Sequence, residues 1–251
     1  MVDDIRLSQA AELIRRSKYT MAFTGAGISV ESGVPPFRGE DGIWSKYDPR
    51  TLELNYFYAN PYESWTVIRE LFYNFFGNAK ANDAHQALAR FEEKGLLECV
   101  VTQNIDNLHQ QAGSENVYEF HGNSQKLVCV QCRTYFTSED IDFDMLPPQC
   151  KCGGLIKPDF IFFGEAIPME AYQRSVRAAG KAELLILIGS TGEVMPAAQI
   201  PYMAKQNGAM IIEVNTELSK FTSPITDVFL HGKAGEVMRQ LYETTLGEPL
   251  N

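Results

Sequence analysis

Short apolar runs alternate along this chain with stretches in which apolar residues recur at helical spacing. Short continuous runs are typical of strands buried on both faces, and spacings of three or four residues are typical of amphipathic helices. The alternation predicts an α/β fold built on a doubly wound parallel sheet. The expected strands are 19–24, 96–101, 117–120, 160–163, 184–188, 209–214 and 227–230. The expected helices are 5–17, 61–76, 84–94, 169–179 and 235–245, with another between 188 and 209, whereas 51–58 has the character of an aromatic loop.

The segment from about residue 123 to residue 158 interrupts this alternation. It contains two cysteine pairs, short β-prone runs (KLVCV and TYF) and a proline pair at Pro147 and Pro148. The main pattern of strands and helices resumes beyond it. We therefore expect a small module inserted into the larger α/β domain.

Polar side chains are concentrated in TQNIDNLH, residues 102–109, directly after the apolar run 96–101. Ligands of open α/β sheets bind just beyond the carboxyl ends of the strands. A buried amide or carboxylate without a partner costs a few kcal/mol, so Gln103, Asn104 and Asp106 indicate a ligand that satisfies them. Asn104 or Asp106 could instead cap a short helix, and this alternative stays open.

A glycine turn marks a second strand end. Gly25, Ala26 and Gly27 follow the run 19–24, where a tight turn lets backbone N–H groups approach a pyrophosphate. Val30 occupies the third glycine position of the Gly-x-Gly-x-x-Gly fingerprint, which argues against a conventional hydride-transferring dehydrogenase. A simple turn between strand and helix is the alternative.

The loop after this turn, residues 32–39, contains two prolines, Phe37 and Arg38. Proline restricts an unbound loop, and an arginine beside an aromatic ring suits a phosphate or ribose contact. We expect this loop to cover a cofactor. A rigid surface loop with a solvated arginine is equally consistent with these residues alone.

Two further strand ends carry candidate ligand contacts. Gly189, Ser190 and Thr191 follow the run 184–188, and Asn215 follows the strand that ends at Val214. Each could be an ordinary turn. Parallel strands would place these ends at the same edge of the sheet as Gly25 and Gln103, where a long dinucleotide could be bound along its length.

Four of the five cysteines are spaced as Cys129-x-x-Cys132 and Cys150-x-Cys152. Two close thiol pairs in an intracellular protein fit a tetrahedral zinc site, and four thiolates leave no open position for catalysis. We expect one structural zinc ion, although a module that folds without metal is the alternative. Cys99, inside an apolar run, is expected to be a small buried hydrophobe.

His121 stands apart from the other histidines because it follows the strand-like run 117–120 and precedes Gly122. A neutral imidazole at a strand end could act as a general base. A structural histidine remains the alternative on spacing alone. His85 is expected to pack in a helix or cap it.

Composition narrows the classes of partner. The chain has 251 residues, enough for one large α/β domain with a smaller one, and a formal net charge of −10 with a pI near 4.9. Such a charge argues against direct nucleic-acid binding, which requires clustered cations. The acidic N-terminus lacks the pattern of a signal peptide, and no run is long and apolar enough to span a membrane. We expect a cytoplasmic protein without a membrane partner.

Taken in order, these motifs resemble those of the sirtuin family of NAD-dependent protein deacylases along nearly the whole chain. The resemblance implies a Rossmann-like large domain and a small zinc-binding domain, with NAD and an acyl-lysine peptide bound between them. The large domain would comprise 1–30, 78–122 and 159–251, the zinc-binding module 123–158, and 31–77 the cofactor-covering loop and the helical part of the small domain. The matching motifs are GAGIS, SGVPPFRG, TQNIDNLH, His121-Gly122, the two cysteine pairs, FFGE at 162–165, GST at 189–191 and VN at 214–215.

The resemblance also implies roles for single residues. His121 corresponds to the family's catalytic base, which activates a ribose hydroxyl after the acyl oxygen has attacked the nicotinamide ribose carbon. Positions implied to contact the acyl-lysine substrate are Ile161, Phe163, Gly164 and Glu165. Positions implied to contact NAD are Gly25, Ala26, Gly27, Phe37, Arg38, Gln103, Asn104, Ile105, Asp106, Gly189, Ser190, Thr191, Asn215, Thr216, Lys233 and Ala234.

The implied activity is removal of acetyl or other uncharged acyl groups from lysine, with release of nicotinamide and O-acyl-ADP-ribose. Members that prefer succinyl or malonyl groups carry a Tyr-x-x-Arg pair on the helix ahead of the position matched by His85, and SWTVIRELFYNFF has none. An apolar pocket without a cation should prefer uncharged acyl groups. ADP-ribosyl transfer to a protein, or an NAD-binding sensor without turnover, are the alternatives. We expect a monomer.

Overall fold

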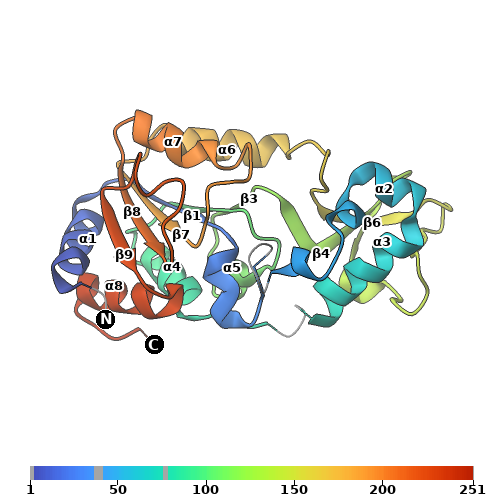
Figure 1. Cartoon of the computed structure of the whole chain (residues 1–251), viewed down its shortest axis with the longest axis horizontal. Coiled ribbons are helices and arrows are strands. Elements are labelled where there is room, and N and C mark those ends of the chain that lie inside the picture. Colours follow the sequence, from blue (N-terminus) through green and yellow to red (C-terminus); the bar gives the residue numbers. More distant parts are fainter. Residues whose placement is uncertain (1–2, 37–41, 76–78, 251) are drawn as a thin grey trace.

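The computed structural model describes residues 3–36, 42–75 and 79–250. These residues form two separate sheets at opposite ends of an elongated molecule (Figure 1). The larger sheet has six parallel strands in the order β3-β2-β1-β7-β8-β9, and the smaller has three antiparallel strands in the order β5-β4-β6. The strands are β1 Thr20–Thr24, β2 Cys99–Thr102, β3 Val117–Glu119, β4 Gly122–Cys129, β5 Tyr135–Thr137, β6 Ile156–Phe160, β7 Leu184–Ile188, β8 Met210–Asn215 and β9 Val228–His231.

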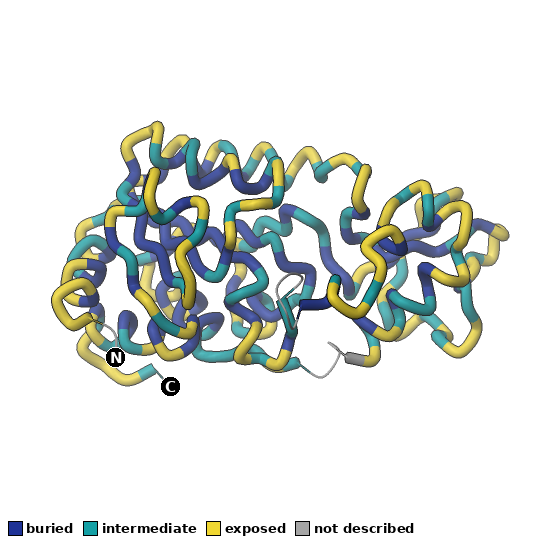
Figure 2. Tube along the Cα trace, viewed as in Figure 1, coloured by how far each residue is buried: buried dark blue, intermediate teal, exposed yellow. Residues whose placement is uncertain are grey.

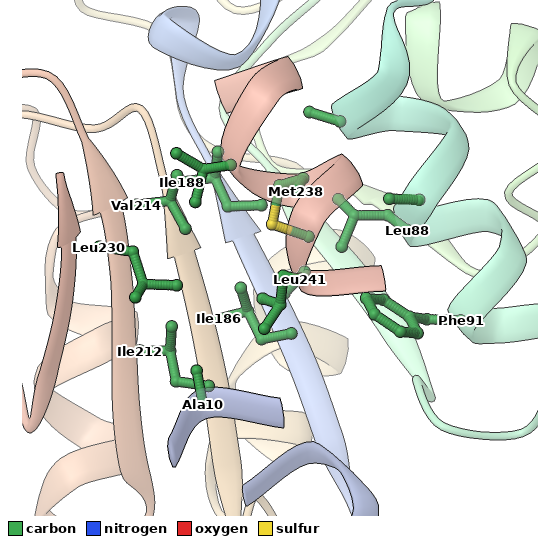
Figure 3. Close-up of a cluster of buried hydrophobic side chains, with 14 of the residues drawn as sticks. Ala10, Leu88, Phe91, Ile186, Ile188, Ile212, Val214, Leu230, Met238 and Leu241 are labelled. Carbon is green, nitrogen blue, oxygen red and sulfur yellow. The ribbon is translucent and has the colours of Figure 1, made fainter. Parts of the chain in front are cut away.

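The large sheet is apolar on both faces because helices cover both of them. Alternate residues of a strand point to opposite faces, so Ile186 and Ile188 of β7 join one core, while Leu185 and Leu187 join the other. Figure 3 shows Ile186 and Ile188 packed against Met238 and Leu241. The first core is completed by α1 Asp4–Arg16, α4 Asp83–Glu93 and α8 Ala234–Leu246, and the second by α6 Met169–Ala179 and α7 Gln199–Gln206.

The small sheet packs against a group of helices from the segment between β1 and β2. Its core is aromatic, with the fully buried side chains of Trp65, Phe57 and Phe72 lying beside Phe160 and Phe162. Figure 2 shows that less of the trace is buried in this part than around the large sheet. The helical elements here are η2 Ile43–Ser45, η3 Pro49–Leu52, α2 Leu54–Ala59, α3 Pro61–Ile68 and the π-helical turn η4 Arg69–Phe75.

The predicted fold class is confirmed, with three local differences. The strand expected at 160–163 is wrong, because β6 ends at Phe160 and belongs to the small sheet. The chain leaves the sheet there, and the backbone N–H of Phe163 donates to Leu52 at 2.9 Å. Residues 51–58 are largely helical, and the helix expected over 61–76 becomes π-helical at Arg69.

The described part of the chain contains no helix that is both long and apolar enough to cross a membrane.

Candidate functional site

The ends of four parallel strands meet at one edge of the large sheet. The N–H of Gly25 donates to Ile188 at 3.0 Å, that of Gln103 donates to Thr24 at 2.9 Å, and that of Gly189 donates to Val214 at 3.0 Å. The residues that follow β1, β2, β7 and β8 are therefore neighbours, as parallel pairing predicts. The strand order reverses direction between β1 and β7, the position where doubly wound sheets bind ligands.

Two glycine turns are packed backbone against backbone at this reversal point. The N–H of Gly27 donates to the carbonyl oxygen of Gly189 at 2.9 Å. A Cβ on Gly27 would lie 2.5 Å from the Cα of Gly189, and a Cβ on Gly189 would lie 2.4 Å from the nitrogen of Ile28. Gly189 also has a left-handed backbone conformation, with φ +60°, so glycine suits this position for both its conformation and its lack of a Cβ. The turns leave backbone, rather than side chains, facing the sheet edge.

Side chains from the neighbouring strand ends join these turns. The Nε2 of Gln103 donates to the hydroxyl of Ser190 at 3.0 Å, and the Nδ2 of Asn215 donates to the carbonyl of Ser190 at 3.2 Å. Thr191 is exposed beside them, and the carbonyl of Thr216 lies 2.9 Å from His231 Nε2. A row of polar groups thus runs along the edge from β2 to β9.

The far end of this row is the N-terminus of α8. Lys233 precedes the helix and is exposed, whereas Ala234 is buried in its first turn. The carboxylate of Glu31 accepts a hydrogen bond from the N–H of Gly235 at 2.6 Å, so the 3-10 helix after β1, η1 Ala26–Ser32, is bonded to α8. A carboxylate at a helix N-terminus is favoured by the helix dipole.

Asp106, in the segment after β2, accepts hydrogen bonds through both carboxylate oxygens. Its Oδ2 accepts from the hydroxyl of Ser29 at 2.7 Å, and its Oδ1 accepts from the N–H of Leu108 at 3.1 Å. Asn104 donates to the same hydroxyl at 3.1 Å. Burial raises the pKa of the Asp106 carboxyl, and the hydrogen bond from Ser29 opposes that rise. One carboxylate oxygen thus bonds the first N–H of the short helix α5 Leu108–Gln111, and the other bonds Ser29.

Two buried histidines pack against each other at this segment: His109 belongs to it, and His85 belongs to α4. His109 Nε2 lies 2.9 Å from the hydroxyl of Thr24, and the His109 ring lies 4.9 Å from that of His85. Burial lowers the pKa of His85 to about 4 and that of His109 well below its ordinary value. Both rings are therefore neutral near pH 7. His85 lies in the first turn of α4, where its Nδ1 accepts from the N–H of the N-cap Asn82 at 3.4 Å, as the capping expectation predicted.

Ile105 connects the two sheets. Its side chain is 9% exposed and packs in the aromatic core of the small sheet, although it follows β2 of the large one. Its carbonyl oxygen accepts from the N–H and the hydroxyl of Ser124, at 3.0 and 2.7 Å. The segment after β2 is thus held from both sides.

His121 lies between β3 and β4, at the junction of the two sheets. Its Nδ1 lies 3.0 Å from the carbonyl oxygen of Gln103. A carbonyl can only accept, so Nδ1 carries the proton and the neutral ring has its lone pair on Nε2. Burial lowers the pKa of His121, and the hydrogen bond to Gln103 opposes that effect. The side chain is therefore a neutral base of fixed tautomer.

The segment 161–165 lies directly beside His121. The N–H of Ile161 donates to the carbonyl oxygen of His121 at 2.8 Å. Phe163 is 47% exposed, with its ring 6.0 Å from that of Trp44, and Gly164 has φ +86°. An exposed phenylalanine ring thus lies in a turn next to the neutral imidazole. Phe37 and Arg38, also predicted to contact a cofactor, lie outside the described residues.

The four predicted cysteines come together in the small sheet. Their Sγ atoms all lie within 4.8 Å of one another, with Cys129 3.5 Å from Cys152 and Cys132 3.6 Å from Cys150. Four thiolates about 2.3 Å from a zinc ion would lie about 3.8 Å apart, so the cluster fits this metal. A Cβ on Gly154 would lie 2.8 Å from the Sγ of Cys129, which makes glycine necessary beside the cluster. Cys99 is separate and fully buried in β2.

Comparison with known proteins assigns the chain to a family. The Sir2 family model matches residues 25–196, which include both glycine turns and all four clustered cysteines. The chain belongs to the Sir2 family. An NAD-dependent protein deacylase of Pyrococcus abyssi is 44% identical over 237 residues, covering 92% of this chain and 94% of the relative. NAD-dependent protein deacylase 2 of Archaeoglobus fulgidus is 44% identical over 249 residues, covering 97% and 96%.

Solved Sir2 structures share the fold. A Sir2 homologue mutant in complex with ADP-ribose has a TM-score of 0.90 at 40% identity and covers 97% of this chain and 99% of its own. A Sir2 mutant with a deacetylated p53 peptide and 3'-O-acetyl ADP-ribose has a TM-score of 0.90 at 37% identity, covering 94% and 97%. The second of these proteins binds both a peptide and an acylated ADP-ribose.

Sequence reasoning missed some residues that the Sir2 site depends on. Ser29 bridges Asn104 and Asp106, and Thr24 contacts His109, yet neither was singled out. The signal for Ser29 was available, since it is the last residue of the GAGIS motif. Thr24 ends β1 and could not be distinguished from an ordinary strand residue.

Gly27→Ala should disrupt the reversal point. The new Cβ would meet the backbone of Gly189 at 2.5 Å, so one turn must move. We expect ADP-ribose affinity, measured by calorimetry, to fall about tenfold or more, with a lower melting temperature. Gly180→Ala is the matched control, because a Cβ there comes no closer than 3.5 Å to another atom. Equal affinities for the two variants would contradict the backbone packing argument.

The cysteine cluster should bind about one zinc ion per chain. We expect Cys132→Ser to lower zinc content, measured by elemental analysis, and to lower the melting temperature of the protein. Cys99→Ser, which changes a buried thiol outside the cluster, should leave the zinc content unchanged. A metal-free wild-type protein that melts at the same temperature with and without added zinc would contradict the assignment.

Proposed function

We propose that this protein removes acetyl or other uncharged acyl groups from protein lysine, consuming NAD and releasing nicotinamide and O-acyl-ADP-ribose. The observation that carries the proposal is the position of His121. It is a neutral imidazole of fixed tautomer, placed between the polar edge of the large sheet and the 161–165 segment. The names of the Sir2 relatives from Pyrococcus abyssi and Archaeoglobus fulgidus support the same activity.

NAD would bind along the row of strand ends. The turns at Gly25 and Gly189 suit the pyrophosphate, because there a phosphate can approach the backbone without meeting side chains. The N–H groups of Gly25, Gly27 and Gly189 are themselves bonded to backbone carbonyls, so they shape these turns and do not donate to the phosphate. Bound NAD would supply an electrophilic ribose carbon once nicotinamide leaves. The remaining contacts assigned to it are Ala26, Gly27, Phe37, Arg38, Gln103, Asn104, Ile105, Asp106, Ser190, Thr191, Asn215, Thr216, Lys233 and Ala234.

The chain's own contribution to the reaction would be positioning and proton transfer. Asn104 and Asp106 would form the nicotinamide end of the site, held by Ser29. His121 Nε2 would accept the proton of a ribose hydroxyl, while Nδ1 stays bonded to Gln103. The zinc cluster would serve folding alone, because four thiolates fill a tetrahedral site.

The acyl-lysine would lie against 161–165. Phe163 offers an exposed ring, and Gly164 and Ile161 offer backbone groups beside His121. The segment SWTVIRELFYNFF has no Tyr-x-x-Arg pair. Tyr47-Asp48-Pro49-Arg50 has that spacing but lies ahead of this segment, where Tyr47 donates to Glu70 at 2.6 Å and Arg50 pairs with Asp48 at 2.6 Å. Such a surface would favour uncharged acyl groups over succinyl or malonyl groups. We further propose that the protein is a cytoplasmic monomer that does not bind nucleic acid directly.

The reaction can be tested by mass spectrometry of an acetyl-lysine peptide incubated with the protein and NAD. Loss of the acetyl group and appearance of O-acetyl-ADP-ribose are expected, and a succinyl-peptide should react more slowly. ADP-ribose added to a protein acceptor would instead indicate ADP-ribosyl transfer. Absence of nicotinamide release would indicate a sensor without turnover.

His121→Ala should lower deacylation by at least about a hundredfold, because it removes the proposed base, while circular dichroism shows a folded protein. In the wild type the base form is the neutral ring, and burial holds its pKa below the ordinary 6.5. Activity should therefore persist at pH 7 and be lost as the pH falls through that lowered pKa. Ile5→Ala, at an exposed position of α1 away from the strand ends, is the control. Retained turnover in His121→Ala would exclude this base.

A further inference from the structure

The ammonium group of Lys157 is buried beside the 161–165 segment. Lys157 lies in β6, and its side chain is only 6% exposed. Its Nζ donates to the carbonyl oxygens of Pro158 and Phe160 at 2.9 and 2.8 Å, and lies 3.0 Å from Oε2 of Glu165. Three acceptors thus match the three ammonium hydrogens. Full pairing explains how a charged lysine is accommodated in this position.

Lys157 completes a series of side-chain bonds along the edge of β6. This strand pairs only with β4 in the described small sheet. The carbonyls of alternate residues point to the same edge, and those of Ile156, Pro158 and Phe160 accept from side chains. Trp65 Nε1 donates to the carbonyl oxygen of Ile156 at 3.0 Å, and Lys157 Nζ donates to the other two carbonyl oxygens. The lysine therefore holds the end of the strand where the chain turns toward His121.

Glu165 carries this restraint across the turn. Its Oε2 accepts from the N–H of Phe162 at 3.0 Å, and its own N–H donates to the carbonyl of Phe162 at 2.9 Å. The carboxylate is thus shared between the Lys157 ammonium and the backbone. The ammonium also lies 4.3 Å from the centre of the Phe162 ring, a cation–π distance. The turn that presents Phe163 is closed by charge-assisted bonds.

The same segment is fixed on two other sides. Ile161 donates to the carbonyl of His121 at 2.8 Å, and Phe163 donates to that of Leu52 at 2.9 Å. Leu54 in turn donates to the carbonyl of Phe163 at 3.0 Å. These are backbone bonds, which substitution by a residue other than proline does not directly remove. The contact from Lys157 is the side-chain restraint that can be varied.

We propose that Lys157 is a positioning residue for the acyl-lysine substrate, which fixes the shape of the 161–165 turn through Glu165. This rests on the proposed function, since that assigns 161–165 to the substrate. Lys157 acts through the turn and does not touch the reacting atoms. Without it the turn would sample other shapes, and substrate would bind at the cost of ordering it.

Stability alone does not account for this ion pair. Well-packed apolar groups of similar volume often replace a buried ion pair without loss of stability, because desolvation offsets the attraction. Burial likewise lowers the pKa of Lys157, and the contact with Glu165 opposes that shift. What an apolar residue could not reproduce is the directional link from β6 to Glu165.

Lys157→Met tests the proposal, because it keeps an unbranched side chain but removes all three donors. We expect the KM for an acetyl-lysine peptide to rise about tenfold or more, with the KM for NAD within about twofold of wild type. Lys157→Arg should recover part of the peptide affinity. A merely structural role would lower the folded fraction, and thus the apparent kcat, while leaving both KM values in place. That result would overturn the proposal.

The matched control is Lys126→Met. Lys126 lies in the same small sheet, 3.4 Å from Glu119, but its side chain is 60% exposed. Both KM values should stay at their wild-type level in this variant. A rise in peptide KM equal to that of Lys157→Met would show a general effect of lysine loss and would contradict the proposal.

A peptide-binding assay distinguishes failure of the positioning proposal from failure of the proposed function. Fluorescence anisotropy of a labelled acetyl-lysine peptide, with ADP-ribose present, reports affinity without turnover. If wild type binds the peptide but releases no acetyl group, the activity fails, and weaker binding to Lys157→Met still supports the positioning role. If Lys157→Met does not fold, Glu165→Gln removes the charge of the link while keeping the lysine's carbonyl bonds. Unchanged peptide affinity in a folded Glu165→Gln would overturn the proposal.

Discussion

The packing of two glycine turns against each other at the centre of the large sheet is the constraint on which the rest depends. Gly27 and Gly189 approach so closely that neither tolerates a Cβ, and their hydrogen bond joins the ends of β1 and β7. Since the strand order reverses here, the segments on either side diverge and leave a backbone-lined edge. The side chains of Gln103, Ser190 and Asn215 can line that edge only because the turns themselves occupy so little space.

A second constraint joins this edge to the small sheet. Only Phe120 and His121 separate β3 of the large sheet from β4, so the chain passes between the sheets at His121 itself. Ile105 crosses in the other direction and packs in the aromatic core. The imidazole and the nicotinamide end of the proposed site are therefore positioned by both sheets. Movement of one sheet relative to the other would change the positions of Ile105 and His121.

The sequence predicted the fold well where one physical signal dominated. The continuous apolar run 184–188 is β7 with the predicted bounds. A strand that is buried on both faces is apolar at every position, so its ends are marked by the first polar residues. The run at 160–163 was misassigned, since apolar character alone does not show that the strand ends at Phe160. The antiparallel pairing of β4 with β6 places Phe160 opposite Gly122 of the small sheet, and the sequence does not show this pairing.

The candidate site could be predicted in its residues but not in their contacts. TQNIDNLH indicated a ligand, yet that Asp106 would both cap Leu108 and hold Ser29 depends on β1 lying beside β2. The same holds for Lys157, whose partners follow from β6 being an edge strand. A lysine in an apolar run is ordinarily assigned to solvent.

The strand β6 explains how a structural metal can matter to a distant site. At its start, Leu155 accepts from the N–H of Val130, one residue after Cys129, so the strand begins at the cysteine cluster. At its other end, it leads into the 161–165 turn beside His121. A zinc ion held by the four cysteines would fix the first end, and Lys157 fixes the second. Zinc would then influence substrate binding through the register of one strand, without taking part in the chemistry.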